Sequence, residues 1–125
     1  MANFSGRRVF VVEDETLVLF NLEDILADLG CEVVGQAMRL DQAITLAKSV
    51  GDVDVAILDV NIGGATVFAA AEILAEKGVP LLFATGYGRD GLPPEWQDRA
   101  VIVKPYSPQD VERALAPLLG VATGT

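Results

Sequence analysis

Short apolar runs rich in β-branched residues alternate with stretches of helical periodicity along the whole chain. Five such runs predict strands at residues 7–12, 31–35, 53–58, 80–84 and 100–103. They are largely apolar on both faces, which is typical of strands in a parallel sheet that helices cover on both sides. The alternation therefore predicts an α/β fold, a (βα)5 unit with a doubly wound, five-stranded parallel sheet.

The helices between these strands are predicted from apolar residues spaced three or four positions apart. In the first helix these residues are Val18, Leu22, Ile25 and Leu29. Similar sets recur within residues 43–50, 67–74 and 111–118. At the start of the last helix, Ser107 and Asp110 have the spacing of a capping box, with Pro108 at the first helical position.

Residues 86–99, between the fourth and fifth predicted strands, contain three glycines and the Pro93-Pro94 pair. An interior glycine costs a helix about 1 kcal/mol relative to alanine, and an interior proline about 3 kcal/mol. The fourth helix is therefore predicted to be short or irregular, and to begin no earlier than Pro94. We expect few buried apolar side chains here, and hence a mobile segment that takes part in any conformational switch.

Composition excludes several classes of protein. The chain contains no histidine, which excludes Ser-His-Asp and Cys-His catalysis, histidine-ligated zinc and a phosphohistidine carrier. Cys31 is the only cysteine, so an internal disulfide is impossible. A net charge of −9 disfavours nucleic acid and anionic membranes as partners, and no apolar run approaches the roughly 18 residues of a membrane span. We expect one cytoplasmic domain over residues 1–125, with its core at about 7–119 and a short tail at 120–125.

Residues that can carry chemistry follow the predicted strands. Glu13 and Asp14 follow the first strand, Asp59 the third, Thr85 the fourth and Lys104 the fifth. Because the carboxyl ends of parallel strands meet at one edge of the sheet, the three carboxylates should converge. Two carboxylates about 5 Å apart repel by roughly 3 kcal/mol at an effective dielectric constant near 20, so a cation should lie between them. Oxygen ligands without sulfur or imidazole favour Mg²⁺, with Mn²⁺ as a substitute. An aspartate beside such a cation, a lysine and a hydroxyl is suited to accept a phosphoryl group.

Four fragments stand at these strand ends: Val11-Val12-Glu13-Asp14-Glu15, Ile57-Leu58-Asp59-Val60-Asn61, Ala84-Thr85 and Val103-Lys104-Pro105-Tyr106. In this order they resemble the receiver domain of bacterial two-component response regulators. The resemblance covers nearly the whole chain and implies a CheY-like, flavodoxin-like strand order of 2-1-3-4-5. Residues 83–88, Phe-Ala-Thr-Gly-Tyr-Gly, resemble a receiver subgroup with a Phe-Ala-Thr-Gly motif, whose members are mostly stand-alone receivers.

The resemblance implies a role for each carboxylate. Asp59 would be the phosphoacceptor. Asp14, Asp59 and the main-chain carbonyl of Asn61 would hold Mg²⁺, and Glu13 would assist through bound water. Members of this family usually have proline at the position of Gly63. We expect the glycine to loosen the loop after Asp59.

It also implies a switch. Thr85 would bond to a phosphoryl oxygen and Lys104 would pair with it, next to a Lys104-Pro105 peptide bond that is usually cis in the family. The aromatic residue that commonly lies three positions before the lysine is Val101 here. Tyr87 and Tyr106 are the candidates to replace it in the switch.

The implied function is that of a single-domain response regulator rather than a turnover enzyme. It would take a phosphoryl group from a histidine kinase or histidine phosphotransfer protein and contact an unknown downstream protein. The alternative is a phosphate sink or shuttle in a phosphorelay, with the same chemistry and no output target. Since Val18 is expected to point inward, Phe20 should face solvent with Leu17 and Asn21 on its flank, and we expect these three residues to contact the phosphodonor.

Two other classes of protein share part of this pattern. Residues 86–91 have the Gly-x-Gly-x-x-Gly spacing of dinucleotide-binding loops, but Pro93 and Pro94 would break the helix that must hold the pyrophosphate. Haloacid-dehalogenase phosphatases also phosphorylate an aspartate after a strand, but their general acid two residues later is an aspartate. Asn61 stands at that position and argues against phosphatase turnover.

Overall fold

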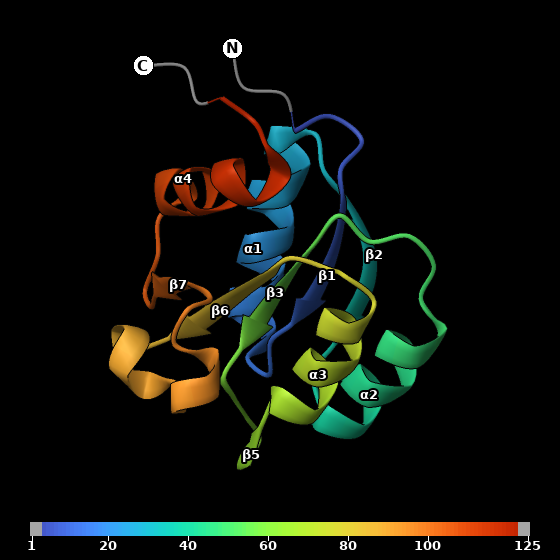
Figure 1. Ribbon diagram of the computed structural model, residues 1–125. Helices are drawn as coiled ribbons and strands as arrows, with labels where there is room; N and C mark the ends of the chain where they lie inside the picture. The colour runs from blue at the N-terminus through green and yellow to red at the C-terminus, as the bar shows by residue number, and fades with distance from the viewer. Residues whose placement is uncertain (1–3, 123–125) are drawn as a thin grey trace.

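The computed structural model describes residues 4–122, so residues 1–3 and residues 123–125 of the predicted tail lie outside it. Its core is a five-stranded parallel sheet in the order β2-β1-β3-β6-β7 (Figure 1). The strands are β1 (Arg8–Val12), β2 (Glu32–Ala37), β3 (Val55–Asp59), β6 (Leu81–Thr85) and β7 (Ala100–Val103). Counted along the chain, these five strands have the predicted order 2-1-3-4-5, which confirms the fold class.

Helices cover both faces of the sheet (Figure 1). They are α1 (Thr16–Leu29), α2 (Leu40–Ser49), α3 (Phe68–Glu76) and α4 (Pro108–Leu119). Alanines of α2 and α3, with Leu74, pack on one face around Phe10 and Phe83. Leucines of α1 and α4 pack on the other face, around Val11 and Ile57. None of the helices within residues 4–122 is long and apolar enough to cross a membrane.

The apolar face of α1 differs from the predicted one. Leu22 and Ile25 are buried as expected, but Val18 and Leu29 are only half-buried. Leu19 and Leu26 complete the buried set. The predicted set and the observed set of apolar residues both have helical spacing. The angle at which α1 packs on the sheet decides which set is buried. The helix ends at Gly30, whose φ of 88° lies in the left-handed region that favours glycine.

The last helix begins as predicted. The hydroxyl of Ser107 accepts a hydrogen bond from the backbone N–H of Asp110 at 3.1 Å, and the Asp110 carboxylate accepts one from the N–H of Ser107 at 2.8 Å. These reciprocal bonds form the capping box, with Pro108 at the first helical position.

The segment between β6 and β7 contains no α-helix, as predicted. Two short 3-10 turns replace it, η1 (Gly88–Gly91) and η2 (Pro94–Trp96). Two of its apolar side chains are nevertheless buried, since Leu92 and Trp96 are only 3% and 7% exposed. The Trp96 ring lies 5.8 Å from that of Phe68 in α3 and 5.5 Å from that of Phe83 in β6. The second half of the segment is therefore anchored to the core.

A short antiparallel hairpin directly follows β3. It consists of β4 (Asn61–Ile62) and β5 (Ala65–Thr66). Gly63 and Gly64 form its turn with φ values of 57° and 83°. Residues other than glycine rarely adopt this left-handed backbone conformation. From the sequence, only a loop is expected here.

Candidate functional site

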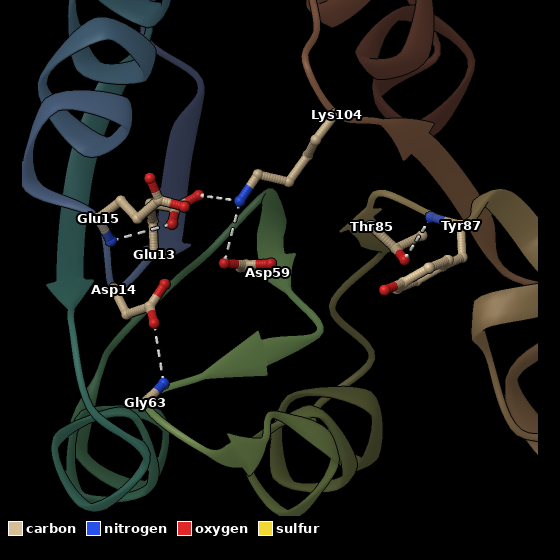
Figure 2. A network of polar contacts seen from close by, with 8 residues as sticks. All are labelled: Glu13, Asp14, Glu15, Asp59, Gly63, Thr85, Tyr87 and Lys104. Atoms are coloured by element: carbon tan, nitrogen blue, oxygen red, sulfur yellow. Dashed lines mark hydrogen bonds and ion pairs between the residues drawn. The ribbon is translucent and has the colours of Figure 1, made fainter.

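Four polar side chains stand at the carboxyl edge of the sheet, each at the end of a different strand (Figure 2). Glu13 follows β1, Asp59 ends β3, Thr85 ends β6 and Lys104 follows β7. Glu13, Asp59 and Thr85 are buried. Acidic side chains are rarely buried unless they are paired, so the partners of the Glu13 and Asp59 carboxylates define the site.

Three carboxylates converge at this edge, as the sequence predicted. Glu13, Asp14 and Asp59 each offer one oxygen, and these oxygens all lie within 4.8 Å of one another. The close approach is possible because β1 and β3 are neighbours in the sheet, with Val12 opposite Leu58.

Lys104 is the cation of this cluster. Its Nζ atom lies 3.1 Å from Oε1 of Glu13 and 3.2 Å from Oδ2 of Asp59. Burial alone would lower the pKa of Lys104, but hydrogen bonds to both carboxylates and their charges raise it above its ordinary value. The ammonium group therefore stays charged, and it holds the two buried carboxylates together.

The negative charge of the cluster is only partly compensated, since three carboxylates face one ammonium group. Burial, and after it the charge of Glu13, raise the pKa of Asp59 to about 7, although Lys104 opposes the rise. A divalent cation would remove this repulsion, and carboxylate oxygens are the ligands that Mg²⁺ prefers. The donor set therefore fits Mg²⁺, and Mn²⁺ as a substitute.

Asp14 is oriented by the hairpin that follows β3. Its Oδ2 atom accepts a hydrogen bond of 2.8 Å from the backbone N–H of Gly63 (Figure 2). Burial would raise the pKa of Asp14, but hydrogen bonds, chiefly this one, lower it. A proline at position 63 has no N–H to donate. The glycine that we expected to loosen this loop therefore ties it to Asp14, a contact that no sequence pattern indicates.

Asn61 lies two positions after Asp59, as the first residue of β4, and it pairs with Thr66 of β5. Its side chain is exposed. The position of Asn61, two residues after Asp59, is compatible with a main-chain carbonyl that binds a metal ion. The role of this carbonyl as a ligand stays a prediction.

The fold and the acidic cluster agree with a known family. The model of the response regulator receiver domain family matches residues 9–116. The chain belongs to this family.

Relatives of this receiver domain include proteins of known structure. SdrG from Sphingomonas melonis Fr1 is 38% identical with a TM-score of 0.79, over 91% of this chain and 97% of SdrG. A BeF3-activated conformation of SdrG from Pseudomonas melonis Fr1 is 36% identical with a TM-score of 0.76, over 92% and 98% of the two chains. The transcriptional regulatory protein PdtaR of Mycobacterium tuberculosis is 32% identical over 113 residues, which are 87% of this chain and 55% of PdtaR. The chain thus spans about half the length of the curated relatives it matches.

The hydroxyl of Thr85 in this receiver domain is turned toward η1. Its Oγ1 atom accepts a hydrogen bond of 3.1 Å from the backbone N–H of Tyr87 (Figure 2). The Tyr87 side chain is 77% exposed. Val101 is partly buried against the same core cluster as Phe83. The peptide bond between Lys104 and Pro105 is cis, as expected.

Tyr106 follows Lys104 by two residues and is half-buried against the core cluster that includes residues of α1 and α4. Burial, and after it the charge of Glu13, raise the pKa of Tyr106 to about 12, so its hydroxyl stays protonated. The Tyr106 ring helps to line an open groove of about 440 Å³ beside the site. The other lining residues are Glu15, Leu17, Val18, Asn21, Lys104 and Pro105.

The three residues expected to contact a phosphodonor are all exposed on α1. Leu17 is 81% exposed and Phe20 is 56% exposed. Leu17 and Asn21 line the groove next to Lys104, whereas Phe20 is not among the lining residues. The groove thus connects the exposed face of α1 with Lys104.

Proposed function

We propose that this receiver domain accepts a phosphoryl group on Asp59 from a histidine kinase or a histidine phosphotransfer protein and signals by phosphorylation-dependent contact with a downstream protein. The observation that carries the proposal is the position of Asp59. Its carboxylate is buried, lies 3.2 Å from the Lys104 ammonium group and shares a cluster with Glu13 and Asp14. The residues and the fold suit an aspartyl phosphoacceptor rather than a turnover enzyme.

The acidic cluster would hold one Mg²⁺ ion, with Mn²⁺ as a substitute. Asp14, Asp59 and the main-chain carbonyl of Asn61 would be direct ligands, and Glu13 would act through water. When bound, the cation supplies positive charge that compensates the phosphoryl oxygens. The hydrogen bond from Gly63 keeps one oxygen of Asp14 occupied and so fixes the direction of the other.

Asp59 would act as the nucleophile in its ionised form. One carboxylate oxygen forms a bond to phosphorus while the P–N bond to the donor's imidazole breaks. The electron pair of that bond stays on the imidazole nitrogen, which takes up a proton from water. Lys104 already lies within hydrogen-bond distance of Asp59 and would transfer its ion pair to a phosphoryl oxygen.

Thr85 would then report the new charge. Its hydroxyl would leave the N–H of Tyr87 and bond to a phosphoryl oxygen, and this movement would release the chain at Tyr87. Tyr87 and Tyr106 lie after Thr85 and Lys104 in the sequence, so both would sense a shift of these two residues. Tyr87 is the more exposed of the two tyrosines and would contact a downstream partner directly.

The phosphodonor would approach over α1. Leu17 and Asn21 line the groove that leads to Lys104, and Phe20 adds an exposed apolar surface on the same helix. Residues 9–38 contain seven acidic side chains and no lysine or arginine. A donor with an apolar patch and a basic rim would therefore complement this surface.

Intact mass measurement tests the proposal. The protein is incubated with acetyl phosphate and Mg²⁺, and we expect a gain of one phosphoryl group. Chelation of the metal should prevent this gain. A modified residue other than Asp59 in a peptide map would refute the assignment.

A further inference from the structure

Gly91, the last residue of η1, packs directly against the side chain of Thr85. A Cβ atom at Gly91 would lie 2.8 Å from Oγ1 of Thr85 and 3.1 Å from Cβ of Tyr87. The first distance is shorter than real Cβ contacts allow, so the present position of the Thr85 hydroxyl excludes any side chain at position 91. The backbone φ of Gly91 is not in the left-handed region. Glycine is therefore required here by space and not by backbone conformation.

The loop around Gly91 is held from both sides. The next residue, Leu92, is buried, and its backbone N–H donates to the carbonyl of Arg89 at 3.0 Å. The Arg89 guanidinium donates to the carbonyl of Gln97 and, at 2.8 Å, to that of Arg99. These bonds join η1 to the segment that Trp96 anchors. A side chain added at Gly91 would therefore act mainly on the Thr85 hydroxyl, whereas the Cβ of Tyr87, at 3.1 Å, would have to move by only a few tenths of an ångström.

We propose that Gly91 is a positioning residue for Thr85. The missing side chain opens the place in which the hydroxyl bonds to the N–H of Tyr87, and this keeps the hydroxyl turned away from Asp59. Gly91 thereby favours the conformation that precedes phosphorylation. The inference rests on the proposed function of Thr85 and Asp59, and it assigns a second function to the glycine-rich segment that had suggested a dinucleotide loop.

The test compares two glycine-to-alanine variants of the full chain. Gly91→Ala adds a methyl group against Thr85. Gly86→Ala adds the same group to the same segment, where a Cβ meets nothing within 4 Å and φ is also ordinary. The first readout is NMR without metal or phosphoryl mimic. In Gly91→Ala we expect altered three-bond couplings across χ1 of Thr85, and hydrogen exchange at the Tyr87 amide that is faster by about fivefold, because one hydrogen bond is lost. Gly86→Ala should match the wild type.

The second readout is titration with beryllofluoride in the presence of Mg²⁺. The inference predicts an apparent affinity for Gly91→Ala that is higher by about threefold or more, since the binding-competent conformation is more populated. Unchanged couplings at Thr85, or an affinity no higher than that of Gly86→Ala, would overturn the inference. Failure of the wild type to bind beryllofluoride would refute the proposed function instead, and the metal-free NMR comparison would still decide the position of the hydroxyl.

A double variant covers the case in which Gly91→Ala is poorly folded. Thr85→Ala removes Oγ1, and the Thr85 Cβ, at 3.7 Å, is in ordinary contact with the added methyl group. The urea midpoint lost in Gly91→Ala, relative to Gly86→Ala, should therefore be largely regained when Thr85→Ala is added. An equal loss in both backgrounds would show that the added methyl group does not act through Thr85.

Discussion

Oδ2 of Asp59 lies 3.2 Å from Nζ of Lys104, so the proposed acceptor is already paired with the cation that would stabilise its phosphorylated form. Lys104 also binds Glu13 at 3.1 Å. The lysine is thus shared between two carboxylates, and a phosphoryl group on Asp59 would offer it a third anionic partner in the same place. This arrangement requires no large movement of Lys104 on phosphorylation.

Asp59→Asn should abolish phosphoryl incorporation from acetyl phosphate, because the amide is not a nucleophile for this reaction. The fold should persist, since asparagine has nearly the same shape and removes a carboxylate that repels Glu13. Intact mass spectrometry measures incorporation, and circular dichroism measures the fold. Incorporation at the wild-type rate would contradict the assignment of Asp59.

The metal-free protein should lose stability as the pH rises from about 4 to about 7. The pKa of Asp59 is raised from 3.8 to about 7 in the fold. Between these values the unfolded chain has released a proton that the folded protein retains, so the free energy of unfolding falls with pH, by at most about 1.4 kcal/mol per unit. Above pH 7 this contribution is constant. Urea unfolding of the wild type and Asp59→Asn at several pH values measures it, and an identical slope in both proteins would argue against it.

Mg²⁺ should stabilise the wild type by about 1.4 kcal/mol when its concentration is ten times Kd. Asp14→Ala removes one carboxylate of the cluster and should lose most of this gain. Thermal melting with and without Mg²⁺ provides the measurement, and Asp41→Ala on the exposed surface of α2 is a matched control. An equal rise of Tm in wild type and Asp14→Ala would place the metal elsewhere.

Phe20→Ala should slow phosphoryl transfer from a cognate kinase and leave labelling by acetyl phosphate unchanged. The reason is that Phe20 is exposed on α1 and does not line the groove beside Lys104. Val103→Ala, which truncates another exposed apolar residue, is the control. Equal slowing with both donors would indicate a general defect of the fold.

Motion in the segment after β6 should be confined to its first half. Leu92 and Trp96 are buried, whereas Gly86 and Tyr87 are exposed, and the N–H of Tyr87 is hydrogen-bonded to the Thr85 hydroxyl, a bond that the proposed switch would break. We therefore expect sharp amide signals over residues 87–99 in the metal-free protein, and broadening over residues 86–88 when beryllofluoride and Mg²⁺ release Tyr87 from Thr85, while signals over 94–99 stay sharp. Uniform broadening up to residue 99 would show that the aromatic anchor opens.

The sheet and the carboxylate cluster could be predicted from the sequence because both depend on simple rules. Apolar runs mark buried parallel strands, and residues that follow such strands meet at one edge. Glu13, Asp59 and Lys104 are therefore found together as soon as the order of the strands is known. The irregular fourth helix was also predictable, because glycine and proline act locally.

Other features depend on packing that no periodicity reveals. The choice of Leu19 over Val18 as a buried residue of α1 depends on how the helix sits on the sheet. The bond from Gly63 to Asp14 depends on a left-handed turn that brings one N–H to a residue 49 positions away in the chain. The burial of Trp96 was missed because a polar, proline-rich stretch gave no sign that one aromatic side chain would reach back into the core.

The aromatic anchor gives this protein a built-in optical reporter. Trp96 is the only tryptophan of the chain, so its fluorescence has a single source. Its ring packs against the rings of both Phe68 and Phe83, and the Arg99 guanidinium lies 5.7 Å from its centroid. Phe83 lies two residues before Thr85 on the same strand. Because Trp96 contacts Phe83, a movement of this strand end should reach the fluorophore, although Trp96 is not part of the site. Emission that shifts to longer wavelength would signal exposure of the ring to water, and stopped-flow mixing could follow it in real time on the unlabelled protein.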